Sequence, residues 1–320
     1  MKFYLAPMEG ITGYVYRGVH HKLFPSIDKY FTPFISPNQN RCMGPREKKD
    51  VLPENNEGIY LVPQILTNNA EYFASTVREL QEFGYNEVNL NFGCPSGTVV
   101  TKKKGAGFLS VPKELDAFLN EIFEKCPDVK ISIKTRVGLE NTDEFGRILD
   151  IYNKYPLEEL IVHPRVQKDF YKNLPRMEAY ELATNEARAQ ICYNGDLFEK
   201  EKFDTFTTRF PQTDAVMIGR GILTNPALAR TLQGGELLKK EELKVFHDEV
   251  YHGYIDRLQD AGEKTVLFKM KELWFYMGKL FPDAKKQLKQ IKKSEKLSNY
   301  EIAVNNLFRE CELTLEGITF

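Results

Sequence analysis

The sequence predicts a (β/α)8 barrel of the TIM type, followed by a small all-α helical domain. Short β-branched or apolar runs recur eight times, with amphipathic stretches between them. Polar or glycine-containing motifs follow most of these runs. Beyond Gly235 the strand-like runs stop and only helix-like segments remain. We therefore expect a barrel domain over residues 1–235 and a helical domain over 236–320.

Each element of the predicted barrel has its own pattern. Between strands, Ala70–Phe83 places Phe73, Val77 and Leu80 on one helix face, and Lys113–Glu124 follows Pro112 at a favoured helix start. Eight parallel strands close a barrel. A doubly wound sheet is the rival, but no GxGxxG sequence follows the first strand. The predicted strands are Phe3–Met8, Lys29–Ile35, Tyr60–Leu66, Glu87–Phe92, Lys130–Thr135, Glu159–His163, Ala189–Tyr193 and Ala215–Ile218.

Unusual polar residues stand at the C-terminal ends of seven of these strands. In a barrel those ends converge on one face, where such residues indicate an active site. Any single cluster is a weak observation, but together they favour the barrel over the rival. They are Pro7-Met8-Glu9-Gly10, Gln64, Asn91 with Cys94, Lys134 with Arg136, His163 with Arg165, Asn194-Gly195-Asp196 and Gly219-Arg220-Gly221.

Cys94 lies on a glycine- and proline-rich turn directly after an apolar run. Glycine and proline break the strand there, so the thiol is presented at a loop mouth. A packed structural cysteine is the better interpretation of such a residue taken alone. Its position on the same face as the other polar clusters favours a chemical role.

The last two clusters suggest a phosphate-bearing cofactor. Asn194-Gly195-Asp196 and Gly219-Arg220-Gly221 end the seventh and eighth strands, where barrels commonly bind phosphate. Glycine lets backbone N–H groups approach an oxyanion, and arginine adds charge. Either cluster alone could be an ordinary tight turn.

Lys134 and His163 would point at the centre of the same face. A buried lysine usually needs an anionic partner, and the N1–C2=O edge of a flavin becomes anionic on reduction. Gln64 offers an amide that could pair with the flavin ring edge. His163 alone is equally consistent with a structural histidine.

Composition points to a soluble, reducing environment. No apolar run approaches the roughly 18 residues of a membrane span, and the start of the chain is too short in apolar residues for a signal peptide. The five cysteines are scattered without a CxxC pair, which argues against a disulfide framework or a zinc site. We expect a cytoplasmic monomer without metal.

Seven motifs, in order along the chain, resemble those of the tRNA-dihydrouridine synthase family, whose members are flavin-dependent barrels with a C-terminal helical domain. The motifs are Ala6–Thr12, Asn89–Pro95, Lys103–Leu109, Ile133–Gly138, Val162–Arg165, Tyr193–Asp196 and Met217–Gly221. The chain departs from the family pattern at His163-Pro164-Arg165-Val166, where His-x-Arg-Thr is usual.

This resemblance implies that FMN is bound and is reduced by NADPH. Hydride would pass from the flavin to C6 of a uracil, and Cys94 would protonate C5. An ordinary thiol pKa of about 8.5 suits such an acid. The residues implied to bind the cofactor are Pro7, Met8, Gln64, Lys134, His163, Asn194, Gly195, Asp196, Gly219 and Arg220. Those expected to bind the substrate are Asn91, Arg136, Arg165, Lys269, Lys271, Lys286 and Lys289.

The segment after residue 235 is similar to the RNA-binding domain of that family. Its predicted helices are Glu242–Leu258, Thr265–Leu280, Asp283–Ser294 and Tyr300–Leu313. The lysines near its end suggest a polyanionic partner, tRNA, although a solvated helix face explains any single lysine run. For Trp274 and its aromatic neighbours we favour a bundle core.

Three functions remain open from the sequence. The first is a synthase acting on tRNA, or on ribosomal RNA. The second is a flavin enzyme for a small molecule, such as a dihydroorotate-type dehydrogenase, which would need no lysine-rich appendage. The third is an RNA-binding protein without chemistry, against which Cys94, Lys134 and His163 together speak.

Overall fold

The computed structural model describes residues 1–257 and 262–318. The chain divides into two compact units. The first consists of Met1–Pro7, Asp28–Asp196 and Thr205–Ile218, and the second of Met8–Ile27, Leu197–Asp204 and the chain from Gly219 onward. The predicted domain boundary after residue 235 stays a prediction.

The first unit holds a sheet of nine strands, and every pair of neighbours is parallel. The pairing order is β3-β2-β1-β9-β8-β7-β6-β5-β4. The strands are β1 Lys2–Leu5, β2 Lys29–Phe31, β3 Leu61–Val62, β4 Gln64–Ile65, β5 Glu87–Phe92, β6 Lys130–Arg136, β7 Glu159–His163, β8 Gln190–Tyr193 and β9 Ala215–Ile218.

The two ends of this order, β3 and β4, flank Pro63. Proline has no N–H to give to a ladder, so it splits the predicted Tyr60–Leu66 strand in two. Its carbonyl still accepts a hydrogen bond of 2.9 Å from the Asn89 N–H. The sheet thus returns on itself at Pro63, which confirms the predicted TIM-barrel architecture.

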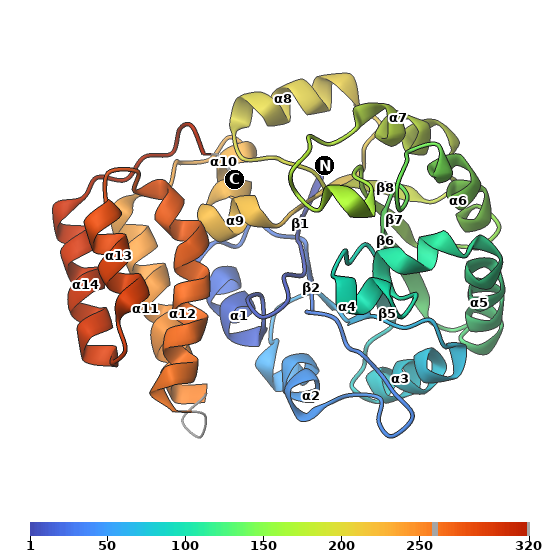
Figure 1. Cartoon of the computed structure of the whole chain (residues 1–320), viewed down its shortest axis with the longest axis horizontal. Coiled ribbons are helices and arrows are strands. Elements are labelled where there is room, and N and C mark those ends of the chain that lie inside the picture. The colour runs from blue at the N-terminus through green and yellow to red at the C-terminus, as the bar shows by residue number, and fades with distance from the viewer. Residues whose placement is uncertain (258–261, 319–320) are drawn as a thin grey trace. The chain divides into compact units, whose positions relative to one another are not determined.

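Helices pack around these strands. Figure 1 shows α3, α5, α6 and α7 on the outside of the strands of the first unit. Aromatic rings join the layers, as where Phe92 of β5 meets Phe118 of α5 and Tyr152 of α6. The helices up to residue 232 are α1 Tyr14–Leu23, α2 Pro45–Val51, α3 Ala70–Glu82, α4 Gly97–Val100, α5 Pro112–Lys125, α6 Glu144–Tyr152, α7 Met177–Glu186, α8 Lys200–Arg209, α9 Arg220–Thr224 and α10 Leu228–Leu232.

The C-terminal part of the second unit is helical, as predicted. Its helices are α11 Lys240–Arg257, α12 Glu263–Met277, α13 Lys285–Lys293 and α14 Leu297–Glu310. They lie side by side (Figure 1). Leu258, the predicted end of α11, lies outside the described residues.

The predicted strands differ from the observed ones mainly at their ends. The first is predicted to reach Met8, but β1 ends at Leu5, and Met8 instead accepts the Ile11 and Thr12 N–H groups in a turn. The second is predicted to reach Ile35, but β2 ends at Phe31, and Ile35 only bridges to Ile65. Within the described residues, no helix is both long and apolar enough to span a membrane.

Candidate active site

The inside of the barrel is polar along β5 and β6. Side chains alternate between the two faces of a strand, so Asn89 and Asn91 face inward while Val88 and Leu90 face the helices. Asn91 is in register with Lys134 of β6, as Asn89 is with Ser132. Paired residues point to the same face, so Lys134 also faces inward.

Amide groups form a continuous chain across this face. The Asn91 amide donates to Gln64 Oε1 (2.7 Å), and Gln64 Nε2 donates to Asn89 Oδ1 (2.8 Å). Asn89 in turn donates to the Ser132 hydroxyl (2.9 Å). Gln64 and Asn91, predicted to touch cofactor and substrate, are therefore brought together and oriented by one another.

The same asparagine fixes the cysteine turn. Asn91 Oδ1 accepts the backbone N–H groups of Gly93 (3.1 Å) and Cys94 (2.9 Å). Ala106 N–H donates to the Cys94 carbonyl at 3.0 Å. Gly105, with φ +55°, lies so close that a Cβ there would meet that carbonyl oxygen at 2.8 Å. The half-buried Cys94 thiol is thus carried on a turn held from three sides.

The Arg136 guanidinium is hydrogen-bonded to two loops. It donates to the carbonyls of Gly93 (2.9 Å), Val166 (2.8 Å) and Phe170 (2.8 Å). Its side chain is fully buried. The sequence predicts a substrate contact here, but these bonds favour a positioning role between the cysteine turn and the loop after β7.

Lys134 has no hydrogen bond or ion pair among the residues that the structure describes. Removal from water, and then the charge of Arg136, lower the pKa of its ammonium group to about 8. An unpaired cation in such a place costs free energy. The surroundings therefore favour an anionic group beside Lys134.

His163 and Arg165 form a second arrangement at the end of β7. A guanidinium can only donate, so His163 Nε2 accepts the bond from Arg165 Nη1 (2.9 Å), and its proton resides on Nδ1. Arg165 also holds the Asp196 carboxylate through both terminal nitrogens. Asp196 is thus an ionic partner of Arg165. This pairing accounts for the position of Asp196, and no role in phosphate binding is needed to explain it.

The remaining cofactor candidates divide between the two units. In the first, the Asn194 amide donates to the Met217 carbonyl (2.7 Å), and Gly195 leaves room for the Tyr193 ring, whose oxygen would lie 2.0 Å from a Cβ there. Pro7 ends the first segment of that unit. In the second, Met8 N–H donates to the Thr12 hydroxyl (2.8 Å). Gly219 precedes α9, and the Arg220 guanidinium lies 5.6 Å from the Phe198 ring centroid.

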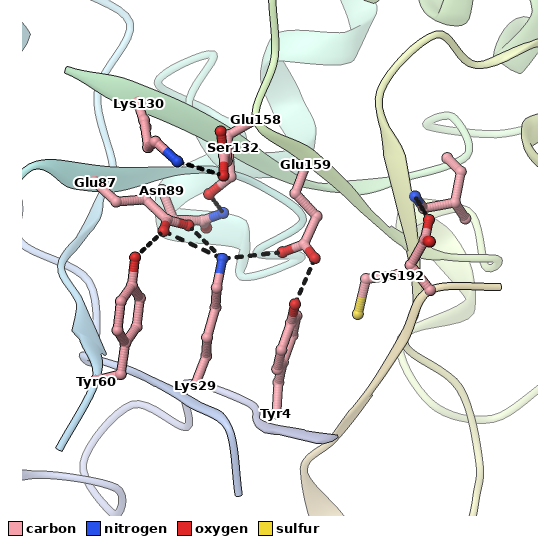
Figure 2. Close-up of polar contacts among 12 residues, drawn as sticks. Tyr4, Lys29, Tyr60, Glu87, Asn89, Lys130, Ser132, Glu158, Glu159 and Cys192 are labelled. Atoms are coloured by element: carbon pink, nitrogen blue, oxygen red, sulfur yellow. Dashed lines mark hydrogen bonds and ion pairs between the residues drawn. The ribbon is translucent and has the colours of Figure 1, made fainter. Parts of the chain in front are cut away.

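A second polar cluster lies at the opposite, N-terminal ends of the strands, where the sequence pattern predicted none. Figure 2 shows Lys29 between Glu87 and Glu159, with Nζ–O distances of 2.8 and 3.9 Å. Tyr60 donates to Glu87 (2.8 Å) and Tyr4 to Glu159 (2.7 Å). Glu87 and Glu159 are the first residues of two wholly buried strands. A glutamate at the start of an apolar strand was the sequence signal that could have predicted this cluster.

Burial makes one carboxyl of this N-terminal cluster a weaker acid than an ordinary glutamate. It raises the pKa of Glu159 to about 7, against the opposing attraction of Lys29. Burial likewise raises the pKa of Cys192 well above its ordinary value. In TIM barrels this end of the strands serves stability rather than chemistry.

The lysines predicted to bind RNA fall into two groups. Lys269 donates to the Gly10 carbonyl and Lys271 to the Ser294 carbonyl, so both ammonium groups already have a hydrogen-bond acceptor within the second unit. Lys286 and Lys289 are exposed on α13, and neither has a hydrogen bond or ion pair in the described part of the chain. Trp274 is buried and donates to the Tyr300 hydroxyl (2.8 Å), as expected for a bundle core. For its neighbour Phe275 the same prediction is wrong, because this ring is exposed.

Similar structures share the barrel. A morphinone reductase structure superimposes with a TM-score of 0.54 at 11% identity, covering 75% of this chain and 87% of that one. The old yellow enzyme from Trypanosoma cruzi gives 0.54 at 9%, covering 80% and 94%. At this identity the likeness concerns the fold alone.

Sequence relatives are more specific. A probable tRNA-dihydrouridine synthase of Staphylococcus aureus (strain Mu50) is 28% identical over 231 residues, which is 70% of this chain and 69% of the relative. The tRNA-dihydrouridine synthase B of Pasteurella multocida is 25% identical over 243 residues, 76% and 71% of the two chains. The model of the dihydrouridine synthase family matches residues 4–311. The chain belongs to the dihydrouridine synthase family, a family of flavin-dependent oxidoreductases.

Proposed function

We propose that this protein is a tRNA-dihydrouridine synthase that binds FMN, takes electrons from NADPH and reduces uridines in tRNA to 5,6-dihydrouridine. The family match over residues 4–311 carries the proposal. The cysteine turn at the end of β5 and the unpartnered Lys134 beside it support it. We further propose that it acts as a cytoplasmic monomer.

The residues present fit a flavin. The ring of a reduced flavin carries negative charge at its N1–C2=O edge, and Lys134 is a cation that lacks an anionic partner among the described residues. Gln64 retains one amide hydrogen beyond its bond to Asn89. His163 presents an Nδ1–H donor. We assign the ring to these three side chains and to Pro7 and Met8.

For the phosphate we propose the stretches that end β8 and β9. Gly195 and Gly219 offer backbone N–H groups, and Arg220 offers charge. The Asn194 side chain is bonded to Met217, so we assign it to holding the strand ends. We assign Asp196 to orienting Arg165, because a carboxylate would repel a phosphate.

When bound, the reduced flavin would supply a hydride to C6 of a uracil. Cys94 would then donate the thiol proton to C5. Asn91 holds the backbone of Cys94 through its carbonyl oxygen, while Arg136 and Ala106 hold the flanking turn. These contacts would hold the thiol at a fixed position over the base. A general acid is most effective when it is held within reach of the atom that it protonates.

RNA would be bound by the basic face of α13. Its five exposed ammonium groups have no hydrogen bond or ion pair within residues 1–257 and 262–318. They are Lys285, Lys286, Lys289, Lys292 and Lys293. Such groups contact phosphates and give affinity that depends on salt but not on sequence. A uridine inside folded RNA would have to be extruded to meet the flavin.

The test is direct. Purified protein should be yellow, and with NADPH it should add two hydrogens per modified uridine to an unmodified tRNA transcript, measured by mass spectrometry of the nucleosides. Ribosomal RNA and small activated alkenes serve as competing substrates. Colourless protein that takes up no FMN would contradict the proposal. So would turnover confined to a small alkene or to ribosomal RNA.

A further inference from the structure

Helices α12 and α13 enclose a groove that the proposed chemistry does not use. It has a volume of about 700 Å³, within the range of ligand pockets. Trp274 and Ile291 form part of its apolar lining. Gly278 allows the close approach of α13, since a Cβ there would lie 3.0 Å from Leu288 Cδ2.

Two aromatic rings stand in this groove without cover. Phe268 and Phe275 are seven residues apart, two turns of α12, and so occupy one face of the helix. They are 58% and 64% exposed, whereas Trp274 next to them is 5% exposed. An uncovered aromatic pair within a groove provides flat faces for stacking.

Glu272 stands between the two phenylalanines in the sequence and also lines the groove. Its Oε2 atom is buried and has no hydrogen-bond partner among the described residues. The nearby Lys269 ammonium donates to the Gly10 carbonyl. A buried acceptor without a donor is costly, so the site suits a ligand that brings an N–H group.

The surroundings of the groove are basic. Lys292 lines it and continues the row of exposed lysines on α13. A ligand that fits must therefore offer a flat ring, a hydrogen-bond donor and a negative charge. A nucleotide has all three, whereas an apolar peptide would leave the lysines and Glu272 unused.

We propose that this groove binds an unpaired, amino-bearing nucleobase of the RNA substrate, stacked on Phe275, with its amino group donating to Glu272 and its phosphate beside Lys292. The inference rests on the proposed function. Uracil has no exocyclic amine and places two carbonyl oxygens around its single N–H. The groove should therefore prefer adenine, cytosine or guanine to uracil.

The experiment measures binding of a fluorescent, unmodified tRNA transcript to the full-length protein by anisotropy over a range of salt. Phe275→Ala should weaken binding at least about fivefold, the lower end of base stacking on an aromatic side chain. It should leave the slope of log affinity against log salt unchanged. Phe275→Tyr should bind like wild type. Val245→Ala, at a 49% exposed apolar residue of α11, is the matched control.

Two comparisons separate stacking from charge and base identity. Lys286→Gln with Lys289→Gln should reduce the salt slope, by roughly 0.7–0.9 for each phosphate that the protein no longer neutralises. Poly(A) and poly(C) should compete with the transcript better than poly(U). In Glu272→Gln the difference in competition between these two polymers and poly(U) should be smaller than in the wild type.

Wild-type affinity in Phe275→Ala would overturn the base site while leaving the proposed synthase intact, provided that the transcript still binds and is reduced. A salt slope that falls in Phe275→Ala would also overturn it. A transcript that neither binds nor is reduced by the wild type would instead refute the proposed function, and the groove assignment with it.

Discussion

The two ends of the barrel interior differ in whether their lysine has an ionic partner. At the N-terminal ends of the strands, Lys29 is paired with Glu87 and lies 3.9 Å from Glu159. At the C-terminal ends, Lys134 has no such partner in the described residues, and removal from water, together with the charge of Arg136, lowers the pKa of its ammonium group. Both lysines are on strands of the same sheet and face inward.

This difference distinguishes charged groups that stabilise the folded chain from charged groups that are available to bind a ligand. A cation paired in the folded chain gains its stabilisation when the chain folds. A cation left unpaired gains it only when an anion binds. The presence or absence of an ionic partner, more than the depth of burial, therefore distinguishes the end of the strands that holds the candidate active site.

The strongest test of the C-terminal end is Cys94→Ala. If this thiol is the proton donor, dihydrouridine formation should fall by about 10²–10⁴-fold, as for loss of a general acid. Flavin content should stay the same, measured by absorbance of the purified protein. Cys311→Ala, which removes another half-buried thiol, is the control and should keep full activity. Undiminished product from Cys94→Ala would remove the residue from this role.

Exchanging the two lysines for methionine tests the comparison itself. Lys29→Met leaves Glu87 and Glu159 buried without their cation, so the free energy of unfolding should drop by about 3–5 kcal/mol. Lys134→Met removes an unpaired, half-buried charge and should change stability little. It should instead weaken flavin binding about tenfold, or roughly 1.4 kcal/mol, and make the flavin harder to reduce.

Denaturant titration and flavin titration of both variants measure these effects. The comparison between the two ends would fail if Lys134→Met unfolded the protein as readily as Lys29→Met, or if flavin affinity were equal in Lys134→Met and wild type.

A smaller effect is expected for Arg136→Lys. Lysine keeps the positive charge but cannot span three carbonyl oxygens with a planar fork. The cysteine turn would lose its bond at Gly93, so turnover should fall about tenfold, about 1.4 kcal/mol in activation free energy, while flavin binding persists. Stopped-flow measurement of flavin reoxidation by tRNA would detect it. Wild-type reoxidation would show that the turn is held without Arg136.

A further effect concerns the pH dependence of stability. Burial raises the pKa of Glu159 to about 7 in the folded protein, above its ordinary 4.5. The folded state therefore binds a proton that the unfolded state releases. This contribution is fully present below pH 4.5 and is lost as the pH rises to about 7. It amounts to roughly 3 kcal/mol.

Glu159→Gln should abolish that loss, so its unfolding free energy should fall less between pH 4.5 and 7 than that of wild type. Glu158→Gln, whose carboxylate pairs with Lys130, is the neighbouring control. Parallel curves for wild type and Glu159→Gln would show that Glu159 ionises alike in both states.

Local sequence patterns were enough to predict the barrel and the end of its strands that holds the candidate active site. Strand periodicity is local, and polar residues that follow parallel strands must meet at one edge of the sheet. Cys94, Lys134 and His163 could therefore be grouped from sequence patterns. The family motifs added the cofactor and the substrate as expectations. The helical character after residue 235 also followed from local pattern.

Which of these side chains already have hydrogen-bond or ionic partners within the protein could be learned only from the three-dimensional structure. Hydrogen-bond partners distant in sequence come together through loops whose course no local pattern fixes. Arg136 is bound to three backbone carbonyls, Asp196 to Arg165 and Lys269 to Gly10, whereas Lys134 is left without a partner in the described chain. The same holds for neighbours on one helix. Trp274 is buried and Phe275 is exposed because packing against α14 and the core selects one helix face, which residue type alone does not specify.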